Sequence, residues 1–192
     1  MKDRKISSEK LNFIIAVCAI FISAASFYAT YLQADAANKQ VKAMNMPLLQ
    51  FSTGNWNSEL KKRQITFTLR NAGLGAAIIK NFNLIYEHEK YNSLAGYLHA
   101  CCEKEFIELK KTSKLESKKV AFTSAVLKNS ILAGQSNNEF VTLGFSDGSK
   151  NFWNKLNDER WKTQLELCYC SLLDDCYITR ENGIAKPVEQ CD

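Results

Sequence analysis

The hydrophobic positions of this chain follow two different patterns, one near the N-terminus and another over the rest of the sequence. Residues 11–32 read LNFIIAVCAIFISAASFYATYL, and none of these side chains is charged. An α-helix rises about 1.5 Å per residue, so about 20 apolar residues are needed to cross the hydrocarbon core of a bilayer. The run therefore predicts a transmembrane helix over residues 11–32, with the lipid bilayer around it.

The polar segment after this run continues the helical pattern. Residues 33–46 are rich in good helix formers, such as Ala, Gln and Lys, up to about Ala43. Pro47 disfavours the helical conformation in the residue that precedes it. We therefore expect the helix to extend beyond the bilayer as a helical stalk over residues 33–46.

Basic residues flank the apolar run unevenly. Four precede it and two follow it closely: Lys2, Arg4, Lys5 and Lys10, then Lys39 and Lys42. Because positive charge tends to stay in the cytoplasm, we expect residues 1–10 to form a cytoplasmic tail and the C-terminal domain to be periplasmic. Ala34-Asp35-Ala36 resembles a cleavage site, but the run is longer than the roughly 7–15 apolar residues of a signal peptide. An uncleaved single-pass anchor in the inner membrane is the prediction.

The body of the chain shows the two-residue period of half-buried β-strands. In residues 62–71, KRQITFTLRN, the apolar Ile65, Phe67 and Leu69 alternate with polar side chains. The sequence NAGLG that follows predicts a turn, in which the glycines can adopt positive φ. Further strands are predicted over residues 48–53, 76–86, 120–127, 139–145, 163–170 and 176–180.

Two segments between these strands carry a helical pattern, near residues 93–111 and 149–161. The second begins with Ser149, a favourable N-cap residue, and its apolar side chains share one face. About seven short strands with turn signals favour an antiparallel β-sandwich. We therefore predict a mainly β chain, with the sandwich and its two helical inserts over residues 47–186 and a C-terminal tail over residues 187–192.

Two stretches carry a resemblance to a known class of domain. LRNAGLGAAIIKNFNLIY, and later ILAGQSNNEFVTL, resemble bacterial immunoglobulin-like extracytoplasmic domains, which often show an N-x-G-x-G-x-A turn and then an L-x-G-x-S turn. The chain is also similar to uncharacterised bacterial single-pass membrane proteins with a C-terminal CYCSxxxxC segment. The resemblance implies an immunoglobulin-like fold and an extracytoplasmic location, and it implies no catalytic residues.

The formal net charge of +5 is concentrated around the apolar run. Six of the 25 Lys and Arg residues, but three of the 20 Asp and Glu residues, precede Pro47. The body is closer to neutral, whereas a nucleic-acid-binding domain presents a basic face. We therefore predict no nucleic-acid partner.

Six cysteines follow the apolar run, and an even number in an exported domain predicts disulfides. These candidates are Cys101, Cys102, Cys168, Cys170, Cys176 and Cys191. In the strand TQLELCYC, residues 163–170, the leucines share one face and the two cysteines share the other. If the leucines face the core, the cysteines point away from it, and a disulfide would explain their position.

The spacing suggests one set of pairs. Cys170 and Cys176 flank the last predicted turn and can face each other across a hairpin. Cys168 would then bind Cys101 or Cys102, and Cys191 would take the remaining thiol. Six cysteines allow 15 pairings, and this is one of them.

A thiolate metal site is the alternative for these residues. The CC pair, the CxC pair and a further cysteine could bind zinc together with His99, but the paired C-x₂₋₄-C knuckles of structural zinc sites are absent. Zinc gains weight if the body is cytosolic, where disulfides are disfavoured. For an exported body we predict no metal and no cofactor.

The sequence contains none of the common catalytic motifs: no H-E-x-x-H, no G-x-S-x-G and no G-x-x-x-x-G-K-[ST]. His88 lies between two glutamates at a predicted strand end, where a solvated position is expected. We therefore predict that the protein is not an enzyme.

Three functional hypotheses remain. The first is an exported interaction module that binds a protein or an envelope component. The second is a membrane-bound sensor with a cytoplasmic ligand-binding domain that acts through helix association, for which small residues such as Ser23 and Ala24 would let two transmembrane helices approach as a homo-oligomer. The third is a thiol oxidoreductase, in which one cysteine of the CxC pair titrates below the usual value of a free thiol.

Overall fold

The computed structural model describes residues 8–115, 121–180 and 184–191. Residues 1–7 of the predicted cytoplasmic tail, Val120 of a predicted strand and Asp192 of the predicted C-terminal tail lie outside the described residues. The chain divides into two compact units, Met1–Ala43 and Met44–Asp192.

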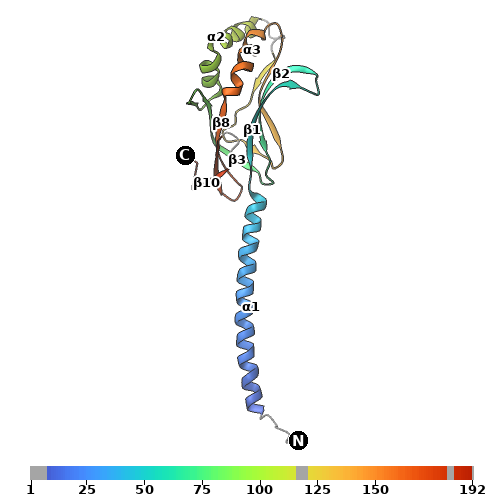
Figure 1. Ribbon diagram of the computed structural model, residues 1–192, viewed down its shortest axis with the longest axis vertical. Coiled ribbons are helices and arrows are strands. Elements are labelled where there is room, and N and C mark those ends of the chain that lie inside the picture. Colours follow the sequence, from blue (N-terminus) through green and yellow to red (C-terminus); the bar gives the residue numbers. More distant parts are fainter. Residues whose placement is uncertain (1–7, 116–120, 181–183, 192) are drawn as a thin grey trace. The chain divides into compact units, whose positions relative to one another are not determined.

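The first unit is formed by helix α1, Ser8–Asn45, whose last two residues belong to the second unit (Figure 1). Its 38 residues correspond to a length of about 57 Å, against about 30 Å for a bilayer core. No residue of α1 is buried, and by length and composition this helix can serve as a membrane span or a signal sequence. The hydroxyl groups of Ser23 and Thr30 donate to carbonyls one turn earlier, which removes the cost of placing them in an apolar segment.

The second unit contains two antiparallel sheets. The four-stranded sheet has the order β1 (Leu49–Asn57), β2 (Lys62–Asn71), β7 (Asn137–Gly144) and β5 (Phe122–Ser124). The larger sheet has the order β10 (Lys186–Val188), β9 (Cys176–Arg180), β8 (Gln164–Cys170), β3 (Ala77–Tyr86) and β4 (Glu89–Tyr91), with β6 (Ile131–Leu132) paired to β3. The chain passes from the smaller to the larger sheet between β2 and β3, and each of these strands pairs within its own sheet with a strand that is distant in sequence, β7 and β8.

Three further helical segments accompany the sheets: α2 (Leu94–Leu115), α3 (Lys150–Glu159) and the 3₁₀ turn η1 (Arg160–Lys162). Figure 1 shows α2 and α3 side by side, and they pack through the rings of Phe106 and Phe152, whose centroids lie 5.4 Å apart. Ser149 is the N-cap residue of α3, as predicted, but its side chain makes no capping hydrogen bond. Its hydroxyl donates to the carbonyl of Gly144 instead.

One hydrophobic core serves both sheets and both helices. The alternation of β2 places Ile65, Phe67 and Leu69 in this core, where each is fully buried. The ring of Phe67 contacts rings from β1, β7 and α2, so the strand predicted over residues 62–71 lies at the centre of the packing.

A buried carboxylate closes the end of α3. Glu159 accepts hydrogen bonds from the ammonium groups of Lys162 (2.7 Å) and Lys155 (2.9 Å) and from the hydroxyl of Tyr86 (2.8 Å). These bonds, that of Lys162 most of all, outweigh burial and lower the pKa of Glu159 to about 2.

The turn after β2 is held by one buried amide. The side-chain oxygen of Asn71 accepts from the N–H groups of Leu48 (3.1 Å) and Gly73 (3.0 Å). Its NH₂ group donates to three carbonyls, those of Gly75 (2.8 Å), Ala133 (3.1 Å) and Leu132 (3.3 Å). Asn71 thus joins three chain segments that are distant in sequence.

The expected reason for glycine in this turn was wrong. No glycine in the described part of the chain has a positive φ. A Cβ on Gly73 would lie 2.4 Å from the carbonyl oxygen of Met46, and one on Gly75 would lie 1.9 Å from that of Asn45. Glycine is needed here because two backbone segments approach closely. The motif NAGLG alone does not show whether its glycines serve a close approach or a positive φ.

The prediction of a mainly β chain also requires correction. The chain is mixed, because α1, α2 and α3 contain 38, 22 and 10 residues. The predicted helical inserts near 93–111 and 149–161 are both present. The three strands that were not predicted, β4, β6 and β10, have only two or three residues each, too few to show a period. One of them, β10, includes the start of the predicted tail.

Candidate functional site

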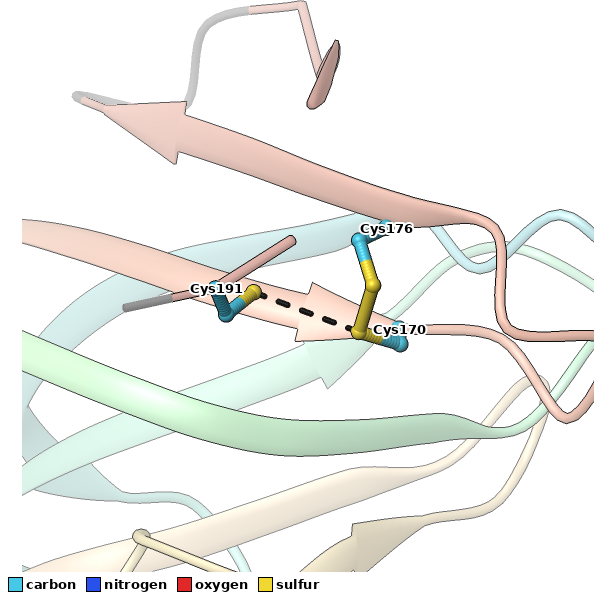
Figure 2. Close-up of side chains that lie close together, drawn as sticks. All are labelled: Cys170, Cys176 and Cys191. Atoms are coloured by element: carbon cyan, nitrogen blue, oxygen red, sulfur yellow. Dashed lines mark hydrogen bonds between the residues drawn. A yellow bond between two sulfur atoms is a disulfide. The ribbon is translucent and has the colours of Figure 1, made fainter. Parts of the chain in front are cut away.

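The turn between β8 and β9 is closed into a small covalent ring. Cys170 and Cys176 are cross-strand neighbours in the register, and their sulfurs are bonded at 2.07 Å (Figure 2). This is the pair that the hairpin spacing predicts. The ring contains residues 171–175, which we call the 171–175 ring.

Hydrogen bonds within the ring fix its backbone. The N–H of Ser171 donates to the carbonyl of Asp175 at 2.8 Å. The hydroxyl oxygen of Ser171 accepts from the N–H groups of Leu173 (3.1 Å) and Asp175 (3.3 Å). Asp174 adopts a φ of 59°, a conformation that Asp tolerates better than most residues. The ring is therefore preorganised by both covalent and hydrogen bonds.

Two leucines point out of this fixed ring. The exposed fractions of Leu172 and Leu173 are 62% and 49%, and the next residue, Asp174, is also exposed. Single exposed leucines are common on protein surfaces. An adjacent pair on a fixed turn forms a contiguous apolar surface that a partner can cover.

A second disulfide lies against the first. Cys168, two residues before Cys170 on β8, is bonded to Cys191, and their Cα atoms lie 5.6 Å apart. Strand β10 brings residue 191 to this place by pairing with β9, with Val188 opposite Cys176. The sulfurs of Cys191 and Cys170 are 4.0 Å apart, the contact dashed in Figure 2. Because every sulfur is in a disulfide, this is a nonbonded sulfur–sulfur contact.

A hollow of about 330 Å³ opens beside Cys168 on the same face of the sheet. Its lining is polar at one side, with the amides of Asn81 and Asn83, and is completed by Ile178, Val188 and Gln190. A neighbouring hollow of about 480 Å³ shares Ile178. The face of β9, β8 and β3 that carries the disulfides is therefore accessible from solvent.

The carboxylate of Glu166 lies at the base of this hollow. It accepts from the ammonium of Lys90 (2.8 Å) and the amide of Asn83 (3.1 Å) and pairs with Arg180. Burial alone would raise its pKa, but the hydrogen bonds from Lys90 and Asn83 and the charge of Arg180 reverse this, so the pKa of Glu166 lies below its usual value.

The predicted bond from Cys168 to Cys101 or Cys102 is wrong. Cys101 and Cys102 are bonded to each other on α2, where both are buried and where the helix is interrupted at Cys102 (φ −151°, ψ 30°). The alternation of β8 indicates the face on which Cys168 lies. It does not indicate that strand β10, too short to be predicted, brings Cys191 to that face.

Cys170 lies on the face of β8 opposite the leucines, as predicted, but it is buried there. Leu165, Leu167 and Tyr169 do face the core, so the alternation of β8 is as predicted. The sulfur of Cys170 is bonded to Cys176 of β9 and lies 4.0 Å from the sulfur of Cys191.

The structure does not assemble the cysteine cluster considered for zinc. In the part of the chain that the structure describes, the cysteine group whose sulfurs all lie within 4.8 Å is Cys170, Cys176 and Cys191. These three are in disulfides rather than thiolates. His99 lies on α2, 3.7 Å from the carboxylate of Glu103. His88 lies in the turn between β3 and β4, with a φ of 71°.

Comparison with known proteins adds no relative: no family model, no curated protein and no solved structure matches the chain.

Proposed function

We propose that the chain is a membrane-anchored, exported interaction module, which binds another protein through the 171–175 ring and performs no catalysis. The observation that carries the proposal is the exposed pair Leu172 and Leu173 on a turn closed by a disulfide. Binding costs free energy when it immobilises flexible groups, at about 0.5–1.5 kcal/mol for each side chain and more for a loop. A ring that is already fixed avoids the loop part of this cost.

The cysteines support an extracytoplasmic location. All six cysteines in the second unit are paired in three disulfides, a state that an oxidising compartment maintains and that cytosolic reductants oppose. Together with the excess of basic residues before α1, this favours a cytoplasmic N-terminus, a span in the inner membrane and a periplasmic second unit.

The strand order supports an immunoglobulin-like sandwich. In such domains one sheet has the order A-B-E-D and the other contains C, F and G. Strands β1, β2, β7 and β5 correspond in chain order and in space to A, B, E and D, and β9, β8, β3 and β4 to G, F, C and C′. The 171–175 ring is then the F–G loop, which is one of the antigen-binding loops in variable domains. This correspondence is an analogy of fold, and the side chains of the ring carry the argument.

The chemistry of the ring indicates the kind of partner. Leu172 and Leu173 require an apolar pocket, and the exposed carboxylate of Asp174 favours basic side chains at its rim. Asp174 and the adjacent Asp175 also disfavour contact with the anionic headgroups of a membrane surface. A protein with an apolar pocket bordered by Lys or Arg fits these requirements.

Location is tested by alkylating intact cells with a membrane-impermeant maleimide, before and after reduction. We expect labelling only after reduction, with the half-buried Cys168 among the labelled residues. Protection until the cells are lysed, with thiols of the second unit that react without reduction, would contradict export; Cys18 in α1 is a free cysteine and is left out of this comparison. That result would support the membrane-bound sensor with a cytoplasmic domain.

Binding is tested by placing a photoreactive amino acid at position 172 in the full chain and irradiating intact cells. We expect an adduct of defined mass that disappears when Leu173→Asp is added. The matched control is the same amino acid at position 60, because Leu60 is equally exposed (58%) but lies in the β1–β2 turn. An adduct pattern that is the same at both positions, or unaffected by Leu173→Asp, would refute the proposed binding site.

A further inference from the structure

The two disulfides on β8 differ in access to solvent. Cys168 and Cys191 are both half-buried, and Cys168 borders the hollow of about 330 Å³. Cys170 and Cys176 have exposed fractions of 3% and 9%. Since exchange requires a thiolate to reach a sulfur, a reagent or a partner from solvent meets the Cys168–Cys191 bond first, at the sulfur of Cys168.

The two bonds are also close enough to exchange. Cys168 and Cys170 lie on the same face of β8 because side chains alternate along a strand, and Cys176 lies opposite Cys170 on β9. The sulfur of Cys191 is 4.0 Å from that of Cys170, and it lies within 4.8 Å of that of Cys176. Cys191 is therefore bonded to Cys168 and lies close enough to Cys170 to form a bond with it instead.

We propose that these four cysteines form a thiol–disulfide exchange site that accepts electrons from a dithiol. A thiolate of the dithiol attacks the sulfur of Cys168, a mixed disulfide forms, and the bond to Cys191 breaks with its electron pair left on the Cys191 sulfur. The Cys191 thiolate then attacks Cys170. The Cys170–Cys191 bond forms, the Cys170–Cys176 bond breaks, and the electron pair leaves on Cys176.

The dithiol completes the reaction. Its second thiolate attacks its own sulfur in the mixed disulfide and releases Cys168 as a thiolate. The dithiol leaves as a disulfide, having lost two electrons and two protons. The protein gains both electrons, and Cys168 and Cys176 take up two protons from solvent. Of the two neighbouring disulfides one remains, now between Cys170 and Cys191.

The second attack requires one movement. Because all three sulfurs lie within 4.8 Å of one another, Cys191 lies beside the Cys170–Cys176 bond and not in line with it, as Figure 2 shows. Displacement at sulfur proceeds along the axis of the bond that breaks. Once the bond to Cys168 is open, Cys191 is no longer covalently tied to β8 and can shift toward this axis.

The exchange opens the 171–175 ring, because the ring is closed by the Cys170–Cys176 bond. The dithiol would thereby control how Leu172 and Leu173 are presented. The exchange chemistry itself does not depend on the proposed binding role, so the two proposals can fail separately.

The test uses the full chain in detergent micelles and a limiting amount of dithiothreitol as the dithiol. After acid quenching and alkylation, peptide mapping without reduction locates the thiols and the remaining bonds. We expect the first thiols at Cys168 and Cys176, together with a Cys170–Cys191 bond. Thiols at Cys168 and Cys191 with the Cys170–Cys176 bond intact would overturn the proposal, and so would initial reduction of Cys101–Cys102.

A variant pair isolates the second step. In Cys168→Ser, the thiol of Cys191 lies beside the ring disulfide, and we expect alkylation at both Cys191 and Cys176. The control is Cys191→Ser, whose remaining thiol at Cys168 is outside the group of sulfurs that lie within 4.8 Å of one another. Among the cysteines of the second unit, we there expect alkylation at Cys168 alone. Alkylation of Cys168→Ser at Cys191 alone would refute the exchange, and mapping of the unmodified chain decides the question if this variant does not fold.

Discussion

Replacing Asn71 by Ala removes the amide that joins the chain segment before β1, the turn after β2 and the loop after β6. The side chain is fully buried, and its five hydrogen bonds all go to backbone groups. Each net hydrogen bond is worth roughly 1 kcal/mol, and a buried group left without a partner costs about 1–3 kcal/mol. The contact with the carbonyl of Leu132 is long, at 3.3 Å, and we expect Asn71→Ala to lower the free energy of unfolding by about 3–4 kcal/mol.

The assay is urea unfolding of the full chain in detergent micelles, followed by the fluorescence of the buried Trp153. The matched control is Asn154→Ala, because Asn154 is exposed on α3 and its replacement should change the unfolding free energy by less than about 0.5 kcal/mol. A loss for Asn71→Ala that is no larger than the control's would refute the reasoning. It would show that the five backbone groups are satisfied without the amide.

Two further predictions concern the second unit. Glu159→Gln should lower the free energy of unfolding at pH 7 by about 1–2 kcal/mol. This is less than the lowered pKa alone would give, because the partner lysines are partly exposed and solvent screens the ion pairs. Because the pKa of Glu159 is lower in the folded state, the carboxylate stabilises the fold above about pH 4.5, and this stabilisation is lost as the pH falls toward 2. In urea unfolding at pH 3, the difference in unfolding free energy between Glu159→Gln and the parent should therefore be smaller than at pH 7. Gly75→Ala should lower the melting temperature well beyond Gly54→Ala, because a Cβ on Gly75 would lie 1.9 Å from a backbone oxygen, whereas one on Gly54 meets a side-chain oxygen at 3.1 Å. Equal melting temperatures for the two glycine variants would contradict the close approach seen at residue 75.

The parts of the fold that could be predicted are those in which one face of a strand is buried. In β2, the predicted and observed bounds coincide, because Ile65, Phe67 and Leu69 face a single core and impose a strict period. The long apolar helix was predictable for a similar reason, since an uncharged run of this length has few alternatives. Strands of two or three residues, such as β6, have no period and are defined only by the strand they pair with.

The candidate site was predictable only in its local part. Cys170 and Cys176 are close in sequence, so the hairpin that contains them brings them together. The partner of Cys168 depends on strand β10, whose three residues include Pro187 and give no strand signal. The bond between Cys101 and Cys102 depends on a local interruption of α2 that a helical pattern does not encode. The 4.0 Å contact between the two disulfides follows from the long-range bond between Cys168 and Cys191 and could not be predicted.

The bond between Cys168 and Cys191 also determines how the second unit would respond to mechanical force. A load applied beyond residue 191 passes through the two sulfurs directly into β8, which pairs with β3 and β9 inside the sheet. Strands β9 and β10 lie within the covalent loop that this bond closes, so they carry no part of the load. Without the bond, the same load would act on the three paired residues of β10 and peel the hairpin from the edge of the sheet. With the disulfide in place, tension enters the sheet at the inner strand β8 and not at the edge strand β10.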